Sequence, residues 1–156
     1  MKVDRTRIGR PAGLLALGLA LASTAACSNK VAVLNAPLTA TAVTGGNSAA
    51  TGLTFGPFNT NAVVMVTAEG ASRYFGPPRN SGVLVSILNG SVALAQDDSF
   101  EGTSTNMIYQ AATSYNFFLA KGQSRRINAR TDHFGSGSAG NRPTRVRMTA
   151  IALAAR

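Results

Sequence analysis

Four arginines near the end of the chain have the clearest capacity for binding chemistry. They lie on two expected strands, as Arg126, Arg130, Arg145 and Arg147. A guanidinium group pairs with a carboxylate or phosphate through two parallel hydrogen bonds. If segments 124–130 and 144–150 lie side by side, the four share one face and predict a site for an acidic glycan or lipopolysaccharide. The alternative is a solubilising face that keeps strands from aggregating. No aromatic residues alternate with them, so nucleic acid is not an expected partner.

Three acidic residues, Asp97, Asp98 and Glu101, could supply oxygen ligands to Ca²⁺. Ser99 and backbone carbonyls would have to complete the shell, because Ca²⁺ takes six or more oxygens. The spacing does not match an EF-hand loop. The alternative is a solvated acidic loop between strands. Calcium is thus one candidate cofactor, and no other cofactor is expected.

His133 is the single histidine, and it lies beside Asp132 and close to Ser136 and Ser138. In a Ser-His-Asp triad the acid orients one ring nitrogen while the other nitrogen accepts the serine proton. Adjacent residues of an extended chain point to opposite sides, and no strained nucleophile turn is present. We therefore expect a histidine in a Gly/Ser-rich loop, no catalytic residues, and a protein that is not an enzyme.

The amino-terminal segment has the three-part order of a cleaved secretory signal. Four basic side chains come first, followed by an apolar run from Ala12 to Ala22 and by small residues up to Ala26. The apolar run is shorter than the roughly 20 residues that a membrane-spanning helix needs. Residues 1–26 are therefore expected to be a signal helix. Their removal takes away four basic side chains and one acidic side chain, which lowers the formal net charge from +9 to +6.

The end of this signal, Thr24-Ala25-Ala26-Cys27, resembles the lipobox of bacterial lipoproteins, with Thr24 where the family usually has leucine. The resemblance implies that Cys27 becomes the lipidated first residue and anchors the protein in a membrane. Ordinary signal-peptide cleavage after Ala22 or Ala26, without lipidation, is the alternative. It would leave Cys27 as a free thiol near the mature amino terminus, since the chain has no second cysteine. Either way, the protein is expected to be exported to the outer membrane, periplasm or cell surface of a bacterium.

The mature chain has few charged residues and many Gly, Ala, Ser, Thr and Asn residues, a composition that favours strands and tight turns. Residues 62–68 are apolar at both odd and even positions, which predicts a strand covered on both faces. Segments 83–88 and 91–95 flank Asn89-Gly90, a strong hairpin signal.

In the later part of the chain, strands and their inward faces are predicted from the alternation of apolar and polar residues. A short strand is expected at 107–109, and 115–119 and 124–130 predict a second hairpin. Tyr115, Phe117 and Leu119 should share one face. Ile127 and Ala129 should face the core, with Arg126, Asn128 and Arg130 outward. The last strand, 144–153, changes its apolar parity after Met148, which predicts a β-bulge.

Seven or eight short strands without a mature helix predict an all-β fold, an antiparallel β-sandwich or jelly roll, over residues 62–156. Residues 27–61 are expected to be a polar linker or edge strands. The Asn-Gly hairpin and the later turn Leu119-Ala120-Lys121-Gly122-Gln123 resemble those of jelly-roll surface modules. We therefore expect a non-enzymatic envelope protein with a binding or structural role. The alternative is a self-assembling subunit of a filament or surface layer, with residues 28–60 added to a neighbour's sheet.

Overall fold

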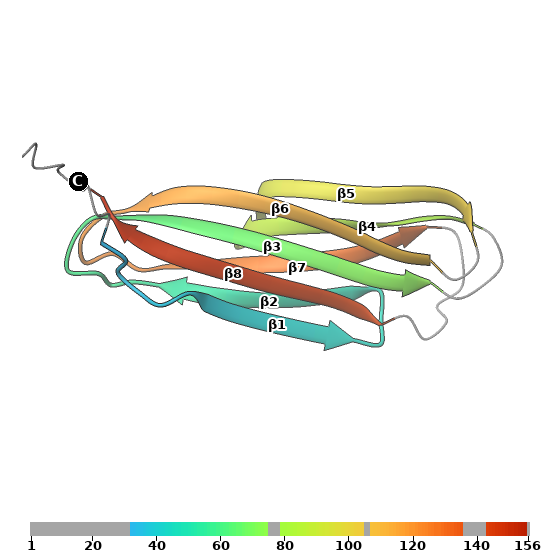
Figure 1. Cartoon of the computed structure of the whole chain (residues 1–156), viewed down its shortest axis with the longest axis horizontal. Coiled ribbons are helices and arrows are strands. Elements are labelled where there is room, and N and C mark those ends of the chain that lie inside the picture. Colours follow the sequence, from blue (N-terminus) through green and yellow to red (C-terminus); the bar gives the residue numbers. More distant parts are fainter. Residues whose placement is uncertain (1–31, 75–78, 105–106, 136–142, 156) are drawn as a thin grey trace, which may run out of the picture.

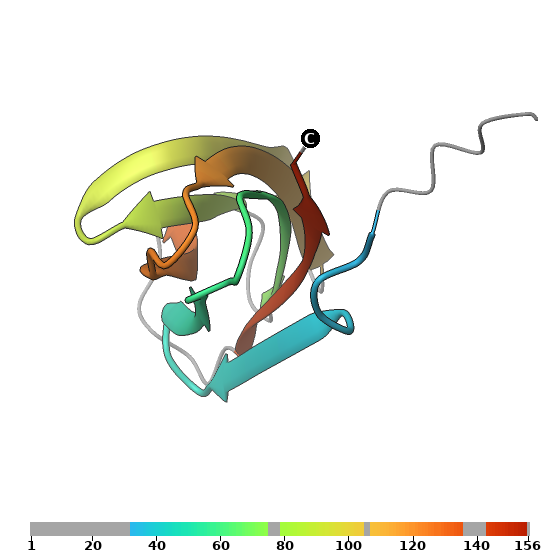
Figure 2. The same ribbon diagram turned by 90° about the vertical axis from the view of Figure 1, so that its left-hand side faces the viewer.

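Eight antiparallel strands make up the computed structural model, which describes residues 32–74, 79–104, 107–135 and 143–155. The strands are β1 (Leu38–Thr44), β2 (Ser48–Phe55), β3 (Ala62–Tyr74), β4 (Arg79–Asn89), β5 (Val92–Ser104), β6 (Met107–Leu119), β7 (Arg125–Gly135) and β8 (Thr144–Ala154). They form two sheets, in the orders β1-β8-β3-β6 and β2-β7-β4-β5, which face each other as a sandwich (Figures 1 and 2). The predicted all-β sandwich is confirmed, and this strand order is that of a jelly roll. The expected signal segment, Cys27, Ser136 and Ser138 lie outside the described residues.

The chain changes sheet at almost every connection, because consecutive strands mostly belong to different sheets. The exception is β4–β5, whose strands are hydrogen-bonded neighbours. The Asn-Gly signal therefore predicted this hairpin correctly. Its turn lies one residue later than expected: Asn89 pairs with Val92, and Gly90 and Ser91 form the loop, with Gly90 at a φ of 61°. The second expected hairpin is wrong, since β6 pairs with β3 while β7 pairs with β2 and β4.

Residues 38–55 belong to the sandwich. The strand β1 pairs with β8 at the edge of one sheet, and β2 pairs with β7 at the edge of the other. The edge-strand interpretation of residues 27–61 is therefore correct for residues 38–55. The sandwich begins well before residue 62. Each of the two strands is paired along one side within its own sheet.

The core lies between the sheets and is built from alternate residues of each strand. Its largest fully buried members come from six of the eight strands: Phe55, Val64, Val66, Val83, Val85, Ile87, Tyr109, Ile127, Val146 and Met148. Phe55 and Phe117 meet edge to face, with ring centroids 5.7 Å apart. Phe117 and Leu119 are buried and Tyr115 packs against them, as their alternation predicts.

The strand β8 keeps one regular register along its length, so the expected bulge is wrong. Ala150 and Ala152 continue the buried face begun by Val146 and Met148, while the larger Ile151 and Leu153 point outward and are half-buried. The larger apolar residues misled the prediction, because alanines occupy the inward positions at this end of β8.

The strand β3 is also covered on one face only. Ala62, Val64, Val66 and Ala68 are buried, but the intervening Val63 and Met65 are 37% and 44% exposed. The expectation of a strand buried on both faces is therefore wrong for this segment. It leaves apolar side chains on the outer surface of the sheet.

In the described parts of the chain, no helix reaches the length and apolarity that crossing a membrane would require.

Candidate functional site

The four arginines of the predicted polyanion site do not share a face. Arg126 and Arg130 lie on β7 and Arg145 and Arg147 on β8, and these strands belong to different sheets. All four side chains are exposed and point away from the sandwich interior. The expected four-arginine patch is therefore wrong, because the two pairs lie on opposite outer faces of the sandwich. Each pair has to be considered as a separate site.

The pair on β7 is engaged with its own neighbours. Arg130 donates to Asp132 Oδ1 from Nε and Nη2, each over 2.8 Å, and also donates to Ser48 Oγ over 3.1 Å. Ser48 Oγ in turn donates to Asp132 Oδ1 over 2.7 Å. Arg126 Nε donates to Asn128 Oδ1 over 3.3 Å. Since Asp132 neutralises Arg130, this face presents less free positive charge than its composition indicates.

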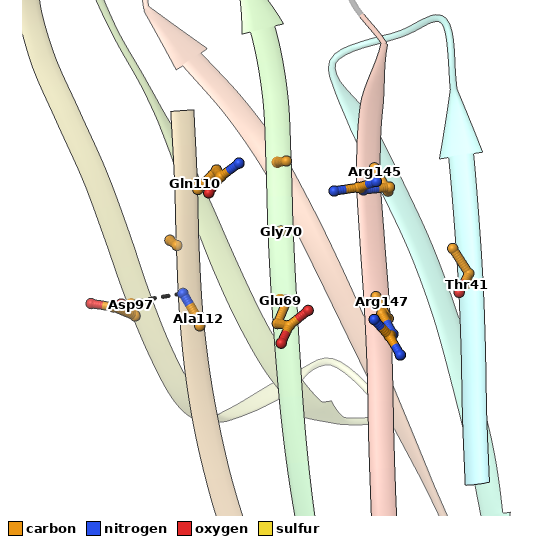
Figure 3. Close-up of a pocket in the computed structure, with 10 residues that line it drawn as sticks. Thr41, Glu69, Gly70, Asp97, Gln110, Ala112, Arg145 and Arg147 are labelled. Carbon is orange, nitrogen blue, oxygen red and sulfur yellow. Dashed lines mark hydrogen bonds between the residues drawn. The ribbon is translucent and has the colours of Figure 1, made fainter. Parts of the chain in front are cut away.

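The pair on β8 borders a hollow on the outer face of the β1-β8-β3-β6 sheet (Figure 3). The hollow measures about 760 Å³, which is within the range of small-molecule sites. Its polar rim comes from all four strands of the sheet and from β5: Thr41, Glu69, Asp97, Gln110, Arg145 and Arg147.

Strand register explains why a hollow forms here. Gln110 on β6, Ala71 on β3 and Arg145 on β8 lie side by side across the sheet. The next outward row contains Ala112, Glu69 and Arg147. In each row an alanine stands beside longer side chains, so its position becomes the floor between them.

Arg145 and Arg147 differ from Arg130 in their electrostatic surroundings. Among the described residues, no carboxylate oxygen lies within 4.0 Å of either guanidinium group. Glu69 is the direct cross-strand neighbour of Arg147 and lies on the same face (Figure 3). Two exposed guanidinium groups and nearby carboxylate and amide groups therefore border one hollow. Such a set can hold an anion and accept hydrogen bonds from hydroxyl groups.

The three acidic residues of the predicted calcium site do not lie in a loop, since all three belong to β5. Asp97 and Asp98 are adjacent in an extended strand, so their side chains point to opposite sides. Asp97 Oδ2 accepts a 3.4 Å hydrogen bond from the backbone N–H of Ala112 at the edge of β6 (Figure 3). Glu101 pairs through its backbone with Ser81 on β4. The expected loop is thus wrong, and the described residues contain no group of three or more potential metal ligands.

His133 lies in β7 and is buried, so the expected loop position is wrong. Its ring meets that of Tyr109 edge to face, with centroids 5.9 Å apart. Asp132 points to the outer face, where it binds Arg130 and Ser48. The predicted divergence of Asp132 and His133 is correct, and it separates the acid from the imidazole of a triad.

Sequence reasoning missed Glu69, Gln110 and Thr41, which complete the rim of the hollow. No motif marks them, because they come from three strands far apart in the sequence. The available signal was alternation, since each is a polar residue at an outward position of its strand.

No protein-family model and no curated protein sequence matches the chain. The solved structures that align with part of the chain include two from one virus. A structure of infectious bursal disease virus strain Gx is 12% identical, with a TM-score of 0.31, and the alignment covers 76% of this chain and 32% of that one. A mutant VP2 protein of the same virus, from derived T=1 particles, is 13% identical, with a TM-score of 0.30 and coverages of 77% and 36%. The chain thus spans about a third of the length of these matches.

Proposed function

We propose that this protein is an exported, lipid-anchored, non-enzymatic β-sandwich of the bacterial envelope that binds an acidic saccharide. The observation that supports binding is the hollow on the β1-β8-β3-β6 sheet, bordered by Arg145 and Arg147 without a carboxylate partner within 4.0 Å among the described residues. The support for export and anchoring is the signal-like segment that ends at Cys27.

The mixed charge of the rim defines the ligand class. Arg145 and Arg147 would bind one carboxylate or similar anionic group, while Gln110, Thr41 and the carboxylates of Glu69 and Asp97 would bind hydroxyl groups. A dense polyanion would bring charge close to Glu69 and Asp97 and be repelled. A saccharide with an occasional acidic group and many hydroxyls fits this rim better than a polyphosphate or nucleic acid.

Charge reversal separates the two arginine pairs and tests binding. In an array of acidic and neutral glycans, the full chain should bind a subset of acidic saccharides, and Arg145→Glu with Arg147→Glu should reduce that binding at least about tenfold. Arg126→Glu with Arg130→Glu is the matched control, with the same charge change on the opposite sheet, and should reduce it less than about threefold. Equal losses for both double variants would show that net charge, and not the hollow, causes binding.

Anchoring has a separate test in cells. Globomycin, which blocks the lipoprotein signal peptidase, should cause a larger precursor to accumulate, and Cys27→Ser should abolish the lipid modification of the protein. An unmodified mature amino terminus in mass spectra of the membrane fraction would refute the anchor and leave the saccharide site unaffected.

A further inference from the structure

An apolar cluster lies on the outer face of the β1-β8-β3-β6 sheet, at the end where β3 begins. We call it the outer apolar patch, and it consists of Val33, Val63, Met65, Phe118, Ile151 and Leu153. Phe118, Val63 and Leu153 are cross-strand neighbours in one row, and Val33 forms a bridge with Leu153. Met65 and Ile151 are neighbours in the next row. The patch is therefore continuous across three strands.

The outer apolar patch is open to its surroundings. Phe118 is 58% exposed, Val33 56%, Met65 44% and Val63 37%. Contiguous exposed apolar side chains of this kind usually mark a surface that binds another protein or a membrane. A jelly roll does not need them for its own core, because the other face of these strands already supplies it.

The path of the chain brings the patch close to the expected anchor. Residues 32–34 run along the end of β8: Leu34 N–H donates to Ala152 O, and Ala154 N–H donates to Ala32 O, each over 2.8 Å. Val33 lies between these two hydrogen bonds and is itself part of the patch. Five residue steps separate Cys27 from Ala32, and an extended chain spans at most about 18 Å over that distance.

The charge beside the patch suits an anionic surface. Lys121 is exposed and follows Phe118 by three residues, and its backbone N–H donates to Asn61 Oδ1, two residues before Val63. Along β3 the first carboxylate after Val63 is Glu69, six residues or about 20 Å away.

We infer that the outer apolar patch docks on the surface of an anionic lipid bilayer, with Phe118 and Met65 inserted among the headgroups and Lys121 beside them. This inference rests on the proposed anchoring, since a lipid on Cys27 would hold the patch within reach of the membrane. Docking would lay the sandwich against the bilayer by one end of this sheet. The saccharide hollow, further along the same sheet, would then open close to the membrane surface.

Vesicle binding tests the docking without the lipid anchor. The full chain with Cys27→Ser is mixed with vesicles of equal amounts of phosphatidylglycerol and phosphatidylcholine, and the bound fraction is measured by sedimentation. The apolar segment 12–22 contributes the same background to every variant. Phe118→Ser should lower the partition coefficient about tenfold. Lys121→Glu should lower it about fivefold or more, and only on vesicles that contain the anionic lipid.

Phe100→Ser is the matched control, because Phe100 is 54% exposed but lies on β5 in the other sheet. It should change the partition coefficient less than twofold. Equal effects of Phe118→Ser and Phe100→Ser, or no effect of Phe118→Ser in a variant that melts normally, would overturn the inference. A dimer that Phe118→Ser converts to a monomer would also overturn it, since a second copy would then cover the patch. Cys27 is absent from this assay, so failure of the anchor cannot be mistaken for failure of the docking.

Discussion

Gly70 controls how closely the two sheets approach beneath the hollow on the β1-β8-β3-β6 sheet. It lies in the middle of β3, and its backbone lines the hollow from below. An added Cβ would run into Thr131 of β7 and Val85 of β4, both fully buried. Neither side chain can move into solvent. Gly70→Ala must therefore push the sheets apart or force both side chains off their rotamers.

Overpacking of this kind costs about 1–3 kcal/mol. For a sandwich of roughly 120 residues the unfolding entropy is about 0.25 kcal/mol/K, so the melting temperature should fall by about 4–12 °C. Calorimetry or circular dichroism measures this directly. Gly46→Ala is the matched control: its nearest new neighbour would be Thr44 Oγ1 at 3.7 Å, an ordinary contact, and its effect should stay within about 0.5 kcal/mol.

A double-mutant cycle separates overpacking from other effects of the alanine. Thr131→Ala removes two of the three atoms that the new Cβ would meet. The double variant should therefore be more stable than the sum of the single changes requires, by at least about 0.5 kcal/mol. If Gly70→Ala melts like Gly46→Ala, or if the cycle shows no coupling, the proposed close approach of the sheets is refuted.

Two further changes test the polar groups of β7. Thr131→Val should stabilise the protein by about 1 kcal/mol in a urea titration. The reason is that Thr131 Oγ1 is buried without a hydrogen-bond partner among the described residues, and valine has the same shape. A loss of stability would mean that this hydroxyl has a hydrogen-bond partner. Asp132→Asn should cost less than about 1 kcal/mol, since the Arg130–Asp132 pair is partly exposed, and should increase retention on heparin by freeing Arg130; unchanged retention would show that Arg130 is not neutralised by Asp132.

The local predictions that the structure confirms rest on patterns among neighbouring residues. Alternation places Ile127 and Ala129 in the core and Arg126 and Arg130 outside, because a strand sends successive side chains to opposite faces. Asn89-Gly90 marks the β4–β5 hairpin, since a two-residue turn needs a residue that tolerates positive φ. Composition and strand number were enough to predict an all-β sandwich.

Local patterns do not show which strands pair with each other, and the candidate site depends on that pairing. Nothing in the sequence between Leu119 and Arg125 shows that the chain crosses to the other sheet there, so a hairpin was the natural but wrong prediction. That crossing separates Arg126 and Arg130 from Arg145 and Arg147 and brings Glu69 and Gln110 to the latter pair. Pairing depends on how all eight strands bury their inner faces together, which is a property of the whole chain.

The sequence by itself thus determined the position of most strands, the direction of most side chains and the signal-like segment that ends at Cys27. The expected segments 107–109 and 115–119 are parts of one strand, β6. Only the tertiary structure decided that residues 38–55 are edge strands, that the arginines form two separate pairs, and that Val63, Met65 and Phe118 stand together on an outer face. The physical reason is the same in each case. Local sequence sets the period of a strand, whereas its neighbours, and therefore its sites, are set by contacts between residues far apart in the chain.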